Sequence, residues 1–171
     1  MRRIVLTFVV LTIVGGSVAL VYGIVGGGER VVQPIAFNHT LHVNEANIPC
    51  VGCHTSAEHE VFAGLPSKTA CFDCHDVAQE DATNPEKAKL FSFAANNQDI
   101  PWRRVAVTRP DVFFSHRRHV GAGEIDCLTC HRDQQTLTVP PPTARLVMDM
   151  KACIECHNHT RASTDCVSCH R

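Results

Sequence analysis

All ten cysteines of the chain lie in one short pattern that occurs five times. Each copy reads Cys-x-x-Cys-His, so every second cysteine is followed directly by a histidine. The copies begin at Cys50, Cys71, Cys127, Cys153 and Cys166 and are called attachment runs one to five below. The pattern is the attachment sequence of c-type haem, in which two thiols form thioethers with the porphyrin and the histidine binds the iron. The sequence therefore predicts five covalently bound haem c groups.

The predicted haem ligands follow directly from this pattern. The thioether residues are Cys50, Cys53, Cys71, Cys74, Cys127, Cys130, Cys153, Cys156, Cys166 and Cys169. The proximal iron ligands are His54, His75, His131, His157 and His170. Two other uses of cysteine are five disulfides and tetrahedral zinc sites. Neither requires a histidine after each pair, and zinc would combine the pairs two by two, which an odd number does not allow.

Six histidines remain after the proximal ligands are assigned, and five irons need five further ligands to be closed. The distal candidates are His39, His42, His59, His116, His119 and His159, with Met148 or Met150 as a methionine alternative for one iron. An iron closed by two imidazoles exchanges electrons and has no open position for a substrate. The ordinary alternative for each candidate is a structural histidine or a packed methionine.

A repeat assigns some of these candidates. The stretch from Phe37 to His54 recurs 77 residues later as Phe114 to His131, so His39 and His116 occupy equivalent places. They are the expected distal ligands of the haems at runs one and three. His59 lies between the first two runs and is assigned to the haem at run two. The haems at runs four and five are left to His42, His119 or His159.

The repeated Phe-x-His-x-x-His followed by Cys-x-x-Cys-His resembles the class III cytochromes c, over roughly residues 34–171. That resemblance implies that the first histidine binds the haem of the following run and the second, His42 or His119, binds a different haem. The whole layout, together with the segments around Leu65 and Trp102, resembles the pentahaem subunits of alternative complex III and of quinone reductase complexes. Those subunits relay electrons between quinone-linked partners and periplasmic carriers.

The N-terminal segment predicts a membrane anchor. Arg2 and Arg3 precede Ile4 to Val25, 22 residues without a charge, and a helix of that length crosses about 30 Å of hydrocarbon. A signal peptide cleaved after Ala19 is the alternative. Basic residues stay on the cytoplasmic side, which would put the haem domain on the periplasmic side of the inner membrane as a single-pass protein.

The elements that must position the ligands are expected to be short. The predicted fold is mostly irregular with short α-helices around a haem core, a class III-like multihaem cytochrome c preceded by one transmembrane helix. Residues 1–28 form the anchor and a glycine hinge, and residues 29–171 form the pentahaem domain. Within that domain we expect half one at 34–76, a linker at 77–98, half two at 99–157 and a fifth haem unit at 158–171.

Charge and composition narrow the partners. The chain has 16 Lys and Arg against 17 Asp and Glu, which does not favour nucleic acid. Five arginines crowd half two, either to pair with haem propionates or to dock an acidic partner: Arg103, Arg104, Arg109, Arg117 and Arg118. The predicted function is electron relay between a quinol-linked membrane partner and a periplasmic carrier, within a complex and without enzyme activity of its own. The alternatives are a multihaem reductase with one open iron and a subunit of an extracellular cytochrome assembly.

Overall fold

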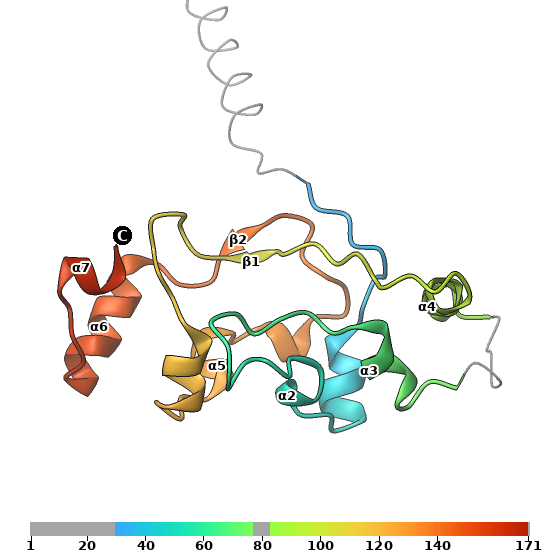
Figure 1. The fold of residues 1–171 in the computed structure, drawn as a ribbon, viewed down its shortest axis with the longest axis horizontal. Helices are drawn as coiled ribbons and strands as arrows, with labels where there is room; N and C mark the ends of the chain where they lie inside the picture. The colour runs from blue at the N-terminus through green and yellow to red at the C-terminus, as the bar shows by residue number, and fades with distance from the viewer. Residues whose placement is uncertain (1–29, 77–82, 171) are drawn as a thin grey trace, which may run out of the picture.

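The computed structural model describes residues 30–76 and 83–170, in which short helices alternate with extended and irregular chain (Figure 1). The elements in chain order are η1 Thr40–Glu45, α2 Cys50–Cys53, α3 Lys68–Phe72, α4 Pro85–Ala95, β1 Ala106–Val107, η3 Arg117–Gly121, α5 Cys127–Cys130, η4 Gln134–Thr136, β2 Arg145–Leu146, α6 Met150–Thr160 and α7 Cys166–Cys169. Helices α2, α5 and α7 each begin and end on the two cysteines of one attachment run. The prediction of a mostly irregular fold with short helices is confirmed.

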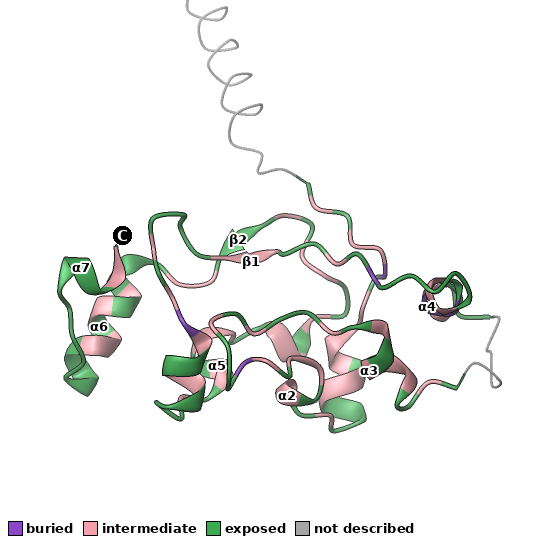
Figure 2. Cartoon of the chain, in the orientation of Figure 1, coloured by how far each residue is buried: buried purple, intermediate pink, exposed green. Residues whose placement is uncertain are grey.

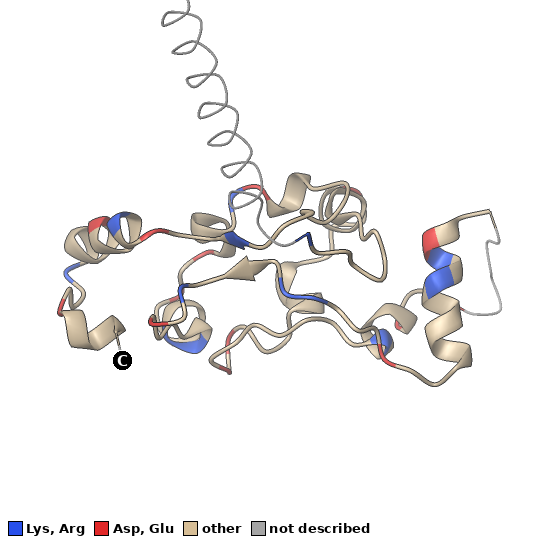
Figure 3. Ribbon diagram, turned by 90° about the horizontal axis from the view of Figure 1, so that it is seen from above, with Lys and Arg blue, Asp and Glu red and all other residues tan. Residues whose placement is uncertain are grey.

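The molecule is long and thin, and the attachment helices are spread along it. Views at right angles agree that α4 lies at one end and that α6 and α7 lie at the other (Figures 1 and 3). The α6 helix, 11 residues long, ends at Arg161, which adopts a left-handed conformation with φ of 60°. Such a residue ends a helix because the chain cannot continue the right-handed turn. Helix α7 follows after a short loop.

Protein side chains alone make only a small core. Figure 2 shows that most of the described chain is exposed or half-buried. In this part of the chain no side chain is less than 2% exposed, and one apolar cluster joins Ile35, Leu90 and Ile100. Phe72, Phe93 and Trp102 pack around that cluster. A domain of this length normally buries far more apolar surface. Much of the burial must therefore come from a large apolar group that the side chains surround.

The segment expected to be a linker contributes to this core. Helix α4 begins at Pro85 after Asn84, whose side chain accepts hydrogen bonds from the amides of Glu86 and Lys87. An asparagine N-cap followed by proline is a strong helix start. Leu90 and Phe91 of α4 are buried, so this part of the linker packs against half one.

The two strands in the described residues are very short. Strands β1 and β2 run parallel, with Ala106 beside Arg145 and Val107 beside Leu146. Two isolated bridges join Arg30 to Thr143 and Val112 to His170. Because these partners are far apart in sequence, the pairing ties the ends of the chain to its middle without forming a layered sheet.

The predicted anchor, Ile4 to Val25, lies outside the described residues. Within the described residues no helix is long and apolar enough to cross a membrane.

Candidate haem centres

Each attachment run folds as a helical turn that fixes the histidine relative to its two cysteines. In runs one, two, three and five the histidine amide donates to the carbonyl of the first cysteine at 2.8 to 2.9 Å. Run four lies inside α6. Asp126 and Asp149 cap α5 and α6 by accepting bonds from the amides of Leu128 and Ala152. All five runs therefore present their cysteines and histidine from a helical backbone.

The alternative uses of cysteine find no support in the geometry. All ten cysteines are unpaired, so the chain contains none of the five disulfides considered above. In the described part of the chain no group of three or more histidine, cysteine or acidic side chains is arranged to hold a bare ion such as zinc. The donors instead occur as separated histidines that face one another across a gap.

Three histidine pairs face each other at similar separations. The ring centroids of His42 and His75 are 6.1 Å apart, and those of His119 and His157 are also 6.1 Å apart. The rings of His116 and His131 are 6.4 Å apart and nearly parallel, at an interplanar angle of 7°. Each pair joins one proximal and one distal candidate.

These separations can be compared with that of two imidazoles on one metal ion. A metal–imidazole bond is about 2.0 Å long and the ring centre lies about 1.1 Å beyond the nitrogen, so two coaxial imidazoles have centroids about 6.2 Å apart. The three observed separations agree with this value to within a few tenths of an ångström. The gap in each pair thus has the width of one iron with two axial histidines.

The protonation of these rings suits metal binding. Burial lowers the pKa of His75, His116 and His131, and a neighbouring histidine lowers the pKa of each ring further. A lower pKa leaves the imidazole neutral near pH 7, and a neutral imidazole has the nitrogen lone pair that a metal requires.

His39 lies near His54, its predicted partner. Burial lowers the pKa of His39, and His54 and then His42 lower it further. The Nδ1 atom of His39 is buried without a hydrogen-bond partner. An unsatisfied buried nitrogen is uncommon in a folded protein and indicates a partner other than the protein chain.

Most of the remaining ligand candidates hold their ring in place through Nδ1. The acceptor is a backbone carbonyl for five of them: Asn38 for His42 at 2.8 Å, Gly64 for His54 at 2.9 Å, Val61 for His116 at 3.2 Å, Ser115 for His119 at 2.9 Å and Ser163 for His157 at 2.5 Å. When Nδ1 carries the proton, Nε2 is left as the free donor, and metal-binding histidines are commonly fixed in this way.

The structure corrects one assignment made from the sequence. His59 was expected to serve the haem at run two, but the ring that faces His75 belongs to His42. The side chain of His59 is 76% exposed and lies 3.9 Å from a carboxylate oxygen of Glu58. Proximity in sequence misled here, because η1 folds back so that His42 reaches the second run.

None of the three facing pairs includes His170, the histidine of the fifth run. His159 is exposed on α6, and Met148 is half-buried in the turn before it. Neither belongs to a facing pair described above. His159 and Met148 therefore stay as predictions for the distal ligand of the haem at run five, and Met150, which is 66% exposed, is a weaker candidate. His59 is left without an assigned haem.

The two halves of the chain support each other through equivalent contacts. The amide of Thr40 donates to the carbonyl of Leu137 at 3.2 Å, and 77 residues later the amide of Arg117 donates to the carbonyl of Glu60 at 2.9 Å. Each half therefore holds the distal-histidine turn of the other half. The contacts obey the same shift as the sequence repeat, so the halves are related by an approximate two-fold axis.

Further pairs obey this symmetry within the two halves. Phe37 stacks on His42 and Phe114 on His119, both with ring centroids 4.4 Å apart. The turns that follow are also alike, since Asn47 and Glu124 both have positive φ, 54° and 52°. The repeat seen in the sequence is thus a repeat of backbone conformation as well as of ligands.

The attachment runs follow one another in space in the order two, one, three, four, five. Burial raises the pKa of the Cys127 thiol, and Cys50 of run one raises it further. Burial also raises the pKa of three other thiols, and a cysteine of a neighbouring run raises each pKa further. The pairs are Cys71 with Cys53, Cys130 with Cys153, and Cys153 with Cys169. Figure 1 shows the same order, because the helices that carry these runs follow one another along the molecule as α3, α2, α5, α6 and α7.

Cys50 and Cys127 occupy equivalent positions of the two halves. Their closeness puts runs one and three together at the approximate two-fold axis. Runs two and four then lie on either side, and run five extends the row at the end formed by α6 and α7.

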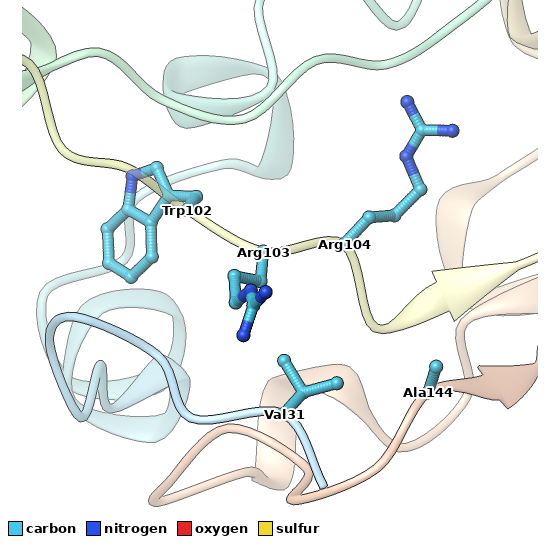
Figure 4. Close-up of a pocket in the computed structure, with 5 residues that line it drawn as sticks. All are labelled: Val31, Trp102, Arg103, Arg104 and Ala144. Carbon is cyan, nitrogen blue, oxygen red and sulfur yellow. The ribbon is translucent and has the colours of Figure 1, made fainter. Parts of the chain in front are cut away.

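The five arginines do not share one set of contacts. Arg109 pairs with Asp111 at 3.4 Å, and the guanidinium of Arg104 lies 4.8 Å from the centre of the Phe62 ring. Arg103 and Arg104 both line a cavity of about 390 Å³, and Figure 4 shows their side chains directed away from each other. This separation gives more support to individual local roles than to one docking face.

Helical attachment turns with histidine pairs spaced for iron define the class of the protein as a multihaem c-type cytochrome. Comparison with known proteins agrees: residues 112–171 match the family described as "Cytochrome c7 and related cytochrome c". The chain is also 33% identical, over 92% of its own length and 88% of the relative's, to a protein of Nitratidesulfovibrio vulgaris (strain Hildenborough) named "Menaquinone reductase, multiheme cytochrome c subunit". The chain belongs to the multihaem cytochrome c family that includes this subunit. The resemblance drawn from the sequence is confirmed, and covalent haem c is the cofactor of the family.

Proposed function

We propose that the chain is a pentahaem c-type cytochrome, anchored in the inner membrane, that relays electrons between a quinol-linked membrane partner and other redox carriers. The observation that carries this proposal is the set of three facing histidine pairs, each as wide as one iron with two axial imidazoles. Bound haem c supplies one-electron exchange, and an iron with two imidazole ligands has no position for a substrate. The chain would thus conduct electrons and catalyse no reaction alone.

The proposed path follows the spatial order of the attachment runs. Electrons would pass along runs two, one, three, four and five, in either direction. Runs one and three form the middle of this path, where Cys50 and Cys127 are neighbours. The ends are run two, near α4, and run five on α7, where Cys166 and Val167 are exposed. An exposed end suits the exchange of electrons with another protein.

The proposed partners and location rest on the sequence and on the relative. The relative is named as a subunit of menaquinone reductase, which supports a quinone-linked complex as the setting for this chain. The apolar segment from Ile4 to Val25 supports a single membrane span, with residues 29–171 as a periplasmic haem domain. The other subunits and a periplasmic carrier would be its redox partners.

The test is purification of the native complex from mildly solubilised membranes. We expect five haems per chain by mass and by pyridine haemochrome, co-purifying membrane subunits, and reduction by a menaquinol analogue. Low-spin spectra that carbon monoxide leaves unchanged would support closed irons. A haem count other than five, a chain that purifies alone, or a mature N-terminus at Leu20 would each overturn the corresponding part of the proposal.

A reductase with one open iron is the second candidate, and it is favoured only at His170. This is the one proximal histidine that belongs neither to a facing pair nor to the His39 and His54 neighbourhood. Carbon monoxide that binds to a single haem, together with turnover of nitrite or a similar oxyanion, would support this candidate. Carbon monoxide binding without turnover would indicate an open iron that serves electron transfer.

A further inference from the structure

His170 differs from the other anchored ligand candidates in the partner of its Nδ1 atom. Five of those candidates place Nδ1 against a neutral backbone carbonyl. The Nδ1 atom of His170 instead lies 3.2 Å from Oδ2 of Asp111, a carboxylate 59 residues earlier in the chain. The partner of this one ring is therefore charged.

The fold holds Asp111 in this place from both sides. The segment that contains Asp111 bridges to the C-terminal end, where Val112 pairs with His170 and the amide of Phe113 donates to the carbonyl of Cys169 at 2.7 Å. The other carboxylate oxygen, Oδ1, is 3.4 Å from Nε of Arg109. With one oxygen next to Arg109, the second oxygen is left to face the imidazole.

A carboxylate acceptor changes the imidazole as a ligand. It draws the Nδ1 proton towards itself and makes Nε2 a stronger electron donor, which favours the more positively charged ferric iron over the ferrous iron. A neutral carbonyl oxygen has a weaker effect on the donor strength of Nε2. We propose that Asp111 is a positioning residue that lowers the reduction potential of the haem at His170 relative to the same haem without this carboxylate.

The inference rests on the proposed function and adds to it a means of tuning one end of the electron path. Asp111 and His170 have side chains that are 53% and 37% exposed, so water weakens the interaction. Second-shell partners of metal-binding histidines typically change metal affinity about 10- to 100-fold, and we expect the low end here. A tenfold change in the ratio of ferric to ferrous stability corresponds to about 59 mV for one electron.

The experiment compares the full-length holoprotein with its Asp111→Asn variant. Asparagine keeps the size and an acceptor oxygen but removes the charge. In a redox titration followed by visible and electron paramagnetic resonance spectra, we expect one of the five couples to rise by about 59 mV. The g-values of that one low-spin haem should move towards those of a histidine hydrogen-bonded to a neutral group, while the other four stay unchanged.

Asp165→Asn is the matched control. Asp165 directly precedes the fifth run, and its carboxylate accepts a bond from Ser163 and is not hydrogen-bonded to a ring nitrogen. Asp165→Asn removes one negative charge near the same haem, as Asp111→Asn does. It should shift the reduction potential of that haem less and leave its g-values unchanged. Equal shifts in both variants, with unchanged g-values, would overturn the inference and indicate a simple charge effect.

Two further variants keep the inference testable if Asp111→Asn assembles poorly. Asp111→Glu retains a carboxylate and should restore most of the wild-type g-values. Arg109→Gln frees the carboxylate from its cation and should shift the same couple downwards. A lack of any shift in a fully loaded Asp111 variant would contradict the inference while the closed-iron relay stands. High-spin haem in the wild-type protein would instead contradict the closed irons of the proposed function.

Discussion

The assignment of His42 to the second attachment run can be tested by removing its imidazole. In His42→Ala the ring that lies 6.1 Å from His75 is gone, and the iron bound by His75 loses its sixth ligand. We expect one haem in five to become high-spin and to bind carbon monoxide. In His42→Met that haem should remain low-spin with a raised potential, because methionine ligation stabilises ferrous iron.

The structure also sets the cost in protein stability. His42 stacks on Phe37 with centroids 4.4 Å apart, a contact worth about 0.5–1.5 kcal/mol. Its Nδ1 bond to Asn38, 2.8 Å long, contributes about 0.5–1.5 kcal/mol more. The free energy of unfolding of His42→Ala should therefore fall by about 1–3 kcal/mol, apart from the lost iron bond. Thermal unfolding of the loaded protein measures this change.

Leu41→Ala is the control, since this neighbouring residue is 47% exposed. It should leave all haems low-spin. The refuting result is a fully loaded His42→Ala protein that binds no carbon monoxide. If His59→Ala instead produced a high-spin haem at the second run, the sequence-based assignment would be restored and the ring pair would have no role as an iron site.

Three further predictions concern the scaffold. Gly121→Ala places a methyl group against the carbonyl of Glu58, where the halves meet, and should lower the free energy of unfolding by about 1–3 kcal/mol in thermal denaturation. Gly52→Ala brings its methyl group no nearer than 3.2 Å to a side-chain carbon of Ile48 and should cost less. Glu124→Gly relieves a positive φ of 52° and should raise the unfolding free energy by about 0.5–1 kcal/mol; a decrease would contradict the assigned turn. A hydrogen bond from Lys89 lowers the pKa of Glu86 below its ordinary value of 4.5, and a bond from the backbone amide of Ala36 lowers it further. The stability that this carboxylate provides should be present above that pH and be lost as the pH falls through its lowered pKa. In Glu86→Gln the free energy of unfolding should therefore depend less on pH in the acid range. The same pH dependence in the variant and the wild-type protein would refute this role.

Local sequence predicted the parts of the site that depend on local chemistry. The attachment turns need only a few consecutive residues, so the pattern Cys-x-x-Cys-His was sufficient to predict short helices there. The pairing of His116 with His131 was predicted as well, because the repeat places both within one unit. These ligands are fixed by short-range backbone geometry, which a sequence motif carries.

Other features depend on how distant segments meet. The resemblance to the class III cytochromes c implied that His42 and His119 bind haems of other runs, and the facing pairs agree with it. The sequence did not predict that His42 faces His75. His42 faces His75 because η1 is held by contacts from the other half of the chain, such as the bond from the amide of Thr40 to the carbonyl of Leu137. The burial of Leu90 in a supposed linker and the contact of Asp111 with His170 also join residues far apart in sequence. No periodicity or motif records such contacts, since each residue is ordinary for its own local segment.

The approximate two-fold axis explains why the chain carries its ligand unit twice. A single unit would expose the turn that holds its distal histidines, because that turn has little apolar core beneath it. In the doubled arrangement the loop after run one supports His116 through Val61, and the loop after run three supports Thr40 in the same way. Each half thus completes the other, as the two subunits of a symmetric dimer do. A symmetric path would have equivalent ends, and the fifth run, with the carboxylate of Asp111 on His170, makes the two ends different.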